Sequence, residues 1–150
     1  MIIDKPYEAG PELVQNPILN KNTNAGRHVD GEYKFDSMRP TSLVLVGSSV
    51  TDKVGCYMAL WDTGSTRSCI SKRIVKELGI KPKRKFIKHK SYTASLRLAS
   101  DLSFSDIELL EYNMPPGIDA VIGMDIISRG ELVFIPDPDS NCGLFRFIVQ

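Results

Sequence analysis

Residues 59–66 read Ala-Leu-Trp-Asp-Thr-Gly-Ser-Thr and carry the strongest structural and chemical signal in the chain. Residues 54–61 are largely apolar and predict a strand, whereas the aspartate, glycine and serine that follow Trp61 favour a turn. Asp62 is therefore expected at a strand exit. A carboxylate there, followed by a hydroxyl and a glycine, can lie in a cleft with backbone N–H groups pointing at it. The triplet alone is a weak signal, because an ordinary Asx turn also explains it.

Short apolar runs ended by turn residues dominate the rest of the sequence. Residues 71–79 show convincing helical spacing, with Ile74, Val75 and Leu78 on one face and Gly79 as a stop. A brief second helix is expected over residues 125–129. Strands are expected over the other apolar runs, at residues 43–46, 54–61, 92–99, 102–112, 118–122, 132–135 and 144–149. Many short strands with one or two short helices predict an all-β, single-domain closed barrel.

The chain is expected to divide at about residue 40. Residues 1–40 hold several prolines, an asparagine-rich run at residues 20–24 and little apolar periodicity, which predicts an irregular N-terminal arm. Residues 41–150 are expected to form the single domain. A chain of 150 residues with 42% hydrophobic and 25% charged residues is typical of a globular protein with one well-buried core.

Charge and cysteine content exclude several classes of partner. With 19 Lys and Arg against 18 Asp and Glu, the net charge of +1 gives no overall field to recruit nucleic acid or anionic lipid. No stretch approaches the length of a membrane span, and the first residues lack a signal-peptide pattern, so no membrane partner is expected. Three cysteines without paired spacing suit a reducing compartment, which predicts a cytoplasmic location. No cysteine pair lies close to a histidine in sequence, so neither a metal nor another cofactor is expected.

A second motif lies downstream, where residues 120–127 read Ala-Val-Ile-Gly-Met-Asp-Ile-Ile. Together with residues 59–66 and the helical segment that follows them, this motif resembles the retropepsin-like family of aspartic peptidases, and particularly its bacterial and phage members. In that family an apolar strand delivers Asp-Thr/Ser-Gly-Ala/Ser, and a later apolar-apolar-Gly segment passes beside it before a C-terminal helix. The resemblance spans about residues 41–149 and implies the closed acid-protease barrel of that family.

The resemblance implies an aspartic endopeptidase that acts on a peptide or protein substrate. Asp62 would be the catalytic carboxylate. Because one chain has a single Asp-Thr-Gly and the reaction needs two carboxylates, a homodimer with one Asp62 from each copy is implied. Thr63, Gly64 and Ser65 would support the catalytic loop, the Thr63 hydroxyl by bonding across the dimer axis and the Gly64 backbone by facing the substrate.

Ile122 and Gly123 are expected to pack against this loop beside the substrate cleft. A backbone that packs there must come very close, and among the amino acids only glycine allows such an approach. The physical reason and the family resemblance therefore point to the same residue, Gly123.

Two features depart from the family pattern. Family members usually hold the substrate under a glycine-rich β-hairpin flap, whereas here no glycine occurs between residues 80 and 116. The viral enzymes also pair an acid with an arginine at positions that correspond to Thr66 and Met124, so that ion pair is absent. Dimer contacts are then expected from residues 144–149 and from the N-terminal arm. The candidate flap residues are Lys85, Phe86, Ile87, Lys88, His89 and Lys90.

Other functions stay open on the sequence. The barrel could be a catalytically inactive module for peptide binding or assembly. Residues 81–90 contain six Lys or Arg, which is compatible with nucleic-acid binding, although a solvated strand face is the commoner explanation. Phosphoryl transfer at Asp62 is disfavoured because the usual motif has a second Asp where Gly64 stands. A nucleophilic Cys69 is disfavoured because neither histidine has an evident relation to it.

Overall fold

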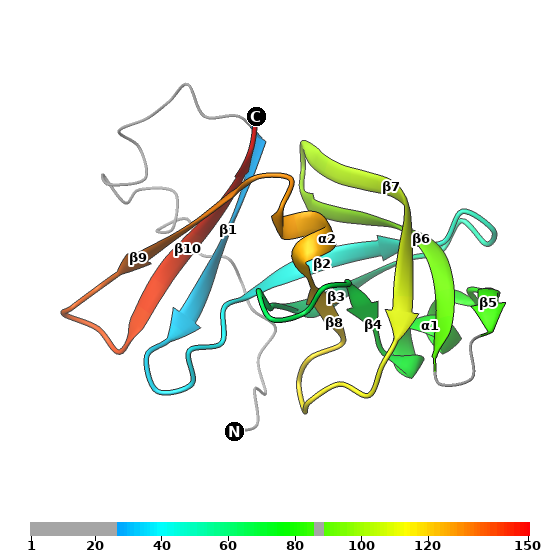
Figure 1. The fold of residues 1–150 in the computed structure, drawn as a ribbon, viewed down its shortest axis with the longest axis horizontal. Coiled ribbons are helices and arrows are strands. Elements are labelled where there is room, and N and C mark those ends of the chain that lie inside the picture. Colours follow the sequence, from blue (N-terminus) through cyan, green and yellow to red (C-terminus); the bar gives the residue numbers. More distant parts are fainter. Residues whose placement is uncertain (1–26, 86–88) are drawn as a thin grey trace.

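The computed structural model describes residues 27–85 and 89–150. Within these residues the chain is built mainly of short strands, with two short helices near the candidate motifs (Figure 1). In chain order the elements are β1 (Arg27–Lys34), β2 (Thr41–Gly47), β3 (Val54–Trp61), β4 (Cys69–Ile70), α1 (Lys72–Leu78), β5 (Pro82–Lys85), β6 (Lys90–Ala99), β7 (Leu102–Glu111), β8 (Ala120–Ile122), α2 (Met124–Ile127), β9 (Glu131–Pro136) and β10 (Cys142–Val149).

Six strands close into a barrel in the order β2, β3, β8, β4, β7 and β6. Strand β6 pairs with both β7 and β2, and this second pairing joins the two ends of the ring. Alternate residues of β2, Ser42, Val44 and Val46, are buried, as period-2 geometry requires of a strand with one face toward a core. The predicted all-β closed barrel with two short helices is confirmed.

An outer sheet of β1, β10 and β9 lies beside the barrel (Figure 1). Phe145 and Phe147 of β10 are fully buried, and their ring centroids lie 5.4 and 5.0 Å from that of Trp61. The indole Nε1 of Trp61 also donates to the Ser42 hydroxyl at 2.9 Å. Trp61 is the last residue of β3, so this aromatic cluster fixes the strand end from which Asp62 emerges.

The predicted irregular arm over residues 1–40 is wrong for residues 27–34, which form β1. This strand pairs antiparallel with β10 along its full length and buries Val29, Gly31 and Tyr33. Its apolar signal is weak, because only two of the three inward positions carry a large side chain. The strand forms because β10 supplies its hydrogen-bonding partner and because Arg146 donates to the Asp30 carboxylate at 2.6 and 2.8 Å. Residues 1–26 lie outside the described residues.

Helix α1 confirms the helix predicted over residues 71–79. The Ser71 side chain accepts a hydrogen bond from the Ile74 amide as the N-cap, and Gly79 ends the helix in the left-handed conformation with φ of 62°. Ile74 and Leu78 are buried against the barrel. No helix in the described part of the chain is long and apolar enough to cross a membrane.

Candidate active-site loop

The two sequence motifs lie side by side in the barrel wall. Strands β3 and β8 are parallel neighbours, with Trp61 opposite Ile122. Directly beyond the last pair, the amide of Asp62 donates to the carbonyl of Ile122 at 3.0 Å. Asp62 is half-buried at the start of the loop, as predicted for a strand exit. The parallel pairing therefore sets where the carboxylate leaves the sheet.

The loop after β3 turns tightly around the Asp62 carboxylate. The Gly64 amide donates to Asp62 Oδ1 at 2.8 Å, and the Ser65 amide donates to the Asp62 carbonyl at 3.2 Å. Thr63 and Gly64 are exposed at the tip of this turn, whereas Ser65 is half-buried and donates its hydroxyl to the Arg67 carbonyl at 2.7 Å. A backbone amide thus fixes the direction of one carboxylate oxygen, while the turn itself faces outward.

Gly123 makes the close backbone approach that the sequence predicts. A Cβ atom placed there would lie 2.6 Å from the Arg67 carbonyl carbon and 2.7 Å from its oxygen. The next residue, Met124, donates its amide to the Ser65 carbonyl at 2.8 Å. The contact is made with residues 65–67 and not with Asp62 itself. Glycine at this position lets the end of β8 brace the far side of the loop.

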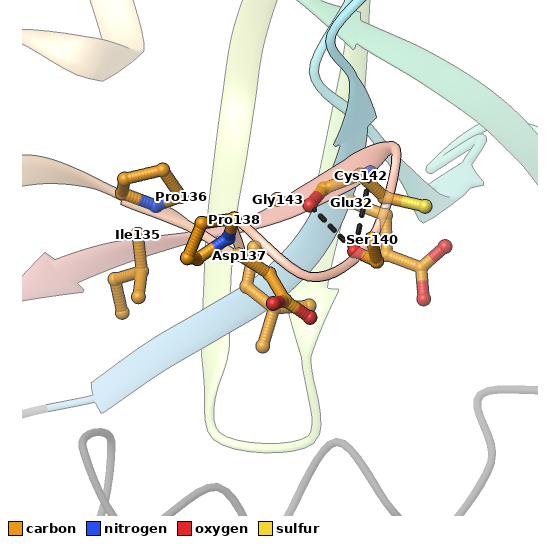
Figure 2. A pocket seen from close by; sticks show the side chains of 9 residues that line it. Glu32, Ile135, Pro136, Asp137, Pro138, Ser140, Cys142 and Gly143 are labelled. Carbon is orange, nitrogen blue, oxygen red and sulfur yellow. Dashed lines mark hydrogen bonds between the residues drawn. The ribbon is translucent and has the colours of Figure 1, made fainter.

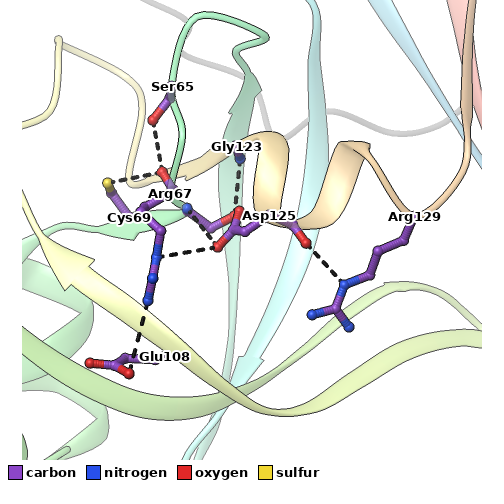
Figure 3. A network of polar contacts seen from close by, with 8 residues as sticks. Ser65, Arg67, Cys69, Glu108, Gly123, Asp125 and Arg129 are labelled. Carbon is purple, nitrogen blue, oxygen red and sulfur yellow. Dashed lines mark hydrogen bonds and ion pairs between the residues drawn. The ribbon is translucent and has the colours of Figure 1, made fainter.

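A polar network joins the end of the same loop to helix α2 (Figure 3). Ser68 is fully buried and donates twice to the Asp125 carboxylate, from Oγ to Oδ1 at 2.7 Å and from its amide to Oδ2 at 3.0 Å. The same Oγ accepts from the Gly123 amide at 3.0 Å. Hydrogen bonds to a charged group each contribute about 1.5–3 kcal/mol. These bonds are therefore the strongest link between the loop and α2.

Arg67 contributes less to this network. Its guanidinium lies 4.0 Å from the Asp125 carboxylate and 3.9 Å from that of Glu108, and its side chain is 47% exposed. Ion pairs that face solvent contribute only about 0.2–1 kcal/mol. The acid–arginine ion pair of the viral enzymes is absent, because the corresponding positions hold Thr66 and Met124. One residue further along each motif, Arg67 and Asp125 form an ion pair at 4.0 Å, with the base in the first motif and the acid in the second.

Sequence reasoning missed the contacts behind the loop, in which Ser68 binds the Asp125 carboxylate and Arg67 lies nearby at 4.0 Å. The signal was present, because Asp125 follows Gly123 by two residues within the second motif. Arg67, soon after Gly64, and Asp125, soon after Gly123, also carry opposite charges. Spacing alone does not reveal that a buried serine would bind the carboxylate.

The candidate flap falls on a hairpin. Strands β5 and β6 pair antiparallel, with Lys85 opposite Lys90, and the intervening residues 86–88 lie outside the described residues. His89 and Lys90 are exposed, and the His89 ring centroid lies 5.9 Å from that of Tyr112. The structure thus places His89 beside the end of β7 rather than at the Asp62 turn. Its flap role stays a prediction.

A hollow of about 380 Å³ lies at the β9–β10 turn, built from the outer sheet and not from the Asp62 loop (Figure 2). Two of its lining residues are bonded to each other, since the Ser140 hydroxyl donates to the Cys142 carbonyl and accepts from the Cys142 amide, at 3.0 and 3.3 Å. Its lining includes Glu32, Pro136 and Asp137. In residues 27–85 and 89–150 no three or more His, Cys, Asp or Glu side chains gather as metal ligands would.

Cys69, the first residue of β4, is poorly suited to act as a nucleophile. Burial, followed by the nearby charge of Asp125, raises the pKa of its thiol to about 11, although Arg67 acts in the opposite direction. The thiol also donates to the Arg67 carbonyl at 3.4 Å. A thiolate is the reactive form of cysteine, and a buried thiol beside an acid resists ionisation.

Gly123→Ala should destabilise the protein by about 1–3 kcal/mol, because the added methyl group meets the Arg67 backbone and the loop must shift. Urea denaturation measures this loss. Thr66→Ala, an exposed change in the same loop, is the control and should stay within about 0.5 kcal/mol of the wild type. Equal stability of all three proteins would show that the close approach at Gly123 imposes no constraint.

Cys69 should be alkylated by iodoacetamide much more slowly than exposed Cys56 at about pH 8, since its thiolate forms only near pH 11. Because the folded pKa lies above the ordinary value of 9, the protonated thiol supports the folded state below pH 9. That contribution is lost as the pH rises toward 11. Mass spectrometry of the two tryptic peptides measures the alkylation rates. Comparable labelling of both thiols would contradict a raised pKa at Cys69.

No protein-family model matches the sequence, and no curated protein matches it. Among solved structures, the chain is similar to a retropepsin-like aspartic protease from Rickettsia conorii, with 15% identity over 83% of this chain and 95% of that chain and a TM-score of 0.47. It is also similar to the retroviral protease-like domain of Ddi1 from Leishmania major, with 17% identity over 67% of this chain and 84% of that chain and a TM-score of 0.40.

Proposed function

We propose that this chain is one subunit of a homodimeric aspartic endopeptidase that hydrolyses peptide bonds with two Asp62 carboxylates. The observation that carries the proposal is the geometry of the Asp62 turn. The carboxylate leaves the barrel beside β8, and the Gly64 amide holds its Oδ1 at 2.8 Å. This is the arrangement that the resemblance of both sequence motifs implies.

A second copy of the chain supplies the second carboxylate in this proposal. Asp125 is another acid that contacts the same loop, but both of its oxygens accept hydrogen bonds from Ser68. Asp125 is therefore already hydrogen-bonded within its own chain and is not the second catalytic acid in this proposal. Thr63 and Gly64 are exposed at the turn, which leaves this surface open to an identical turn from another subunit. A two-fold axis beside the turn would bring the two Asp62 side chains together.

The paired carboxylates would share one proton. Two like charges a few ångströms apart do not both ionise readily, so the pair titrates as a unit. The unprotonated carboxylate takes a proton from a bound water, and that water attacks the carbonyl carbon of the scissile peptide. The protonated partner donates to the carbonyl oxygen. This chemistry needs neither a metal nor a covalent intermediate.

The neighbouring residues would take supporting roles. The Thr63 hydroxyl would bond across the axis, and the exposed Gly64 backbone would face the substrate chain. Ser65 holds the end of the turn through its bond to the Arg67 carbonyl. Ile122 and Gly123 form the wall against which the loop is braced.

Edge-to-edge pairing of the C-terminal strand between subunits would require this strand to give up a partner within its own chain. Strand β10 pairs with β1 on one edge and with β9 on the other, so both of its hydrogen-bonding edges are occupied. In this proposal, residues 144–149 therefore contribute to the dimer through their side chains. The turn at residues 62–65 becomes the first place to seek the subunit interface.

A tandem-linked dimer tests whether the two Asp62 side chains act together. The linked wild type should cut a peptide library at mildly acid pH. Asp62→Asn in only one half should lower kcat/KM by about 10²–10⁴-fold, because a lone carboxylate cannot serve as both acid and base. Peptide cleavage followed by mass spectrometry measures the effect.

Asp101→Asn in one half is the matched control, since Asp101 is an exposed acid in the β6–β7 turn, and it should leave the rate unchanged. Retention of half the activity in the Asp62 variant would show that each chain works alone. An intact, dimeric wild type that cuts nothing would overturn the peptidase proposal.

A further inference from the structure

We infer that Asp125 is a positioning residue that holds the Asp62 loop in place through Ser68, an inference that rests on the proposed peptidase function. Asp125 lies in the first turn of α2, whereas Ser68 lies 57 positions earlier in the chain, at the end of the loop that Asp62 begins. Figure 3 shows the carboxylate of Asp125 at the centre of the contacts that join the two segments.

The loop is tied to the second motif at both of its ends. At its start, the Asp62 amide donates to the Ile122 carbonyl at 3.0 Å. At its end, Ser68 donates twice to Asp125 and accepts from the Gly123 amide. Between these points the Ser65 carbonyl accepts from Met124 at 2.8 Å. Residues 62–68 therefore have little freedom to move relative to β8 while these bonds persist.

A carboxylate is the side chain that this position requires. Ser68 presents two donors, its amide and its hydroxyl, and an ionised carboxylate offers an acceptor to each. An asparagine offers one acceptor oxygen, and its NH₂ group only donates, so one of the two Ser68 donors would lose its acceptor. The serine is fully buried, so water does not readily replace a lost partner.

The other contacts of Asp125 are secondary. Arg67 lies 4.0 Å from its carboxylate and is nearly half exposed, so solvent screens this pair. Arg129 donates to the backbone carbonyl of Asp125 at 2.9 Å and so braces α2 rather than the carboxylate. Asp125 thus positions the loop through Ser68. Loss of the Arg67 side chain should change kcat and KM little.

Asp125 would act on the rate through geometry and not through contact with the substrate. Its oxygens are taken up by Ser68, whereas the Asp62 carboxylate is oriented at the other end of the loop. A displacement of about 1 Å in a reacting group can cost about 10²-fold in rate. Loss of the Asp125 bonds should therefore lower kcat and leave KM nearly unchanged, because the surfaces that bind the peptide are retained.

The test compares Asp125→Asn, Ser68→Ala and Arg67→Ala in the full chain. We expect Asp125→Asn and Ser68→Ala each to lower kcat by about 10²-fold with KM within about threefold of the wild type. Arg67→Ala, the matched control, should change neither constant by more than about threefold. The double variant of Asp125 and Ser68 should be no slower than the worse single variant, since residues that act as a unit are not additive.

Amide hydrogen exchange of residues 62–68 supplies a readout that does not depend on peptidase activity. Exchange in this segment should be faster in Asp125→Asn than in wild type, and unchanged in Arg67→Ala. If the wild type proves inactive, the peptidase proposal fails, while faster exchange would still support the hold on the loop. Unchanged exchange in both Asp125→Asn and Ser68→Ala, or a rise in KM at constant kcat, would overturn the inference. If Asp125→Asn does not fold, Ser68→Ala carries the same test.

Discussion

The close approach of two backbones at Gly123 is the constraint on which the rest of the site depends. A side chain there would collide with the Arg67 carbonyl, so the loop after β3 could not reach the end of β8. Because glycine allows this approach, the amides of Asp62, Gly123 and Met124 all donate hydrogen bonds between the loop and the segment at the end of β8. The candidate carboxylate is therefore placed by backbone contacts, and the Gly64 amide orients one of its two oxygens.

The surrounding fold keeps this junction rigid. Trp61, the residue before Asp62, is held between the barrel and the outer sheet by Phe145 and Phe147. On the other side, Asp125 anchors the loop through the buried Ser68. Groups anchored to strands and short helices hold their geometry better than groups on free loops, which suits the role proposed for the Asp62 carboxylate.

Much of the barrel and the position of Asp62 could be predicted because local patterns encode them. The apolar run before Asp62 and the helical spacing of residues 71–79 correspond to β3 and α1. Strand β1 was missed because only Val29 and Tyr33 of its inward positions carry a large side chain. Its pairing partner β10 is also distant in sequence, with Arg146 lying 116 positions after Asp30. The Ser68–Asp125 bonds were missed for a similar reason, since they join residues 57 positions apart. Contacts of this kind arise from tertiary structure and leave no periodic signal.

The central claim is that one active centre contains the Asp62 carboxylates of two chains. A crystal structure of the protein as it associates in solution tests this most directly. The account predicts that the two Asp62 side chains face each other across a two-fold axis, with carboxylate oxygens about 3 Å apart. A stable dimer whose Asp62 side chains lie on separate faces, or a protein that stays monomeric at the concentrations where it cuts peptides, would contradict it.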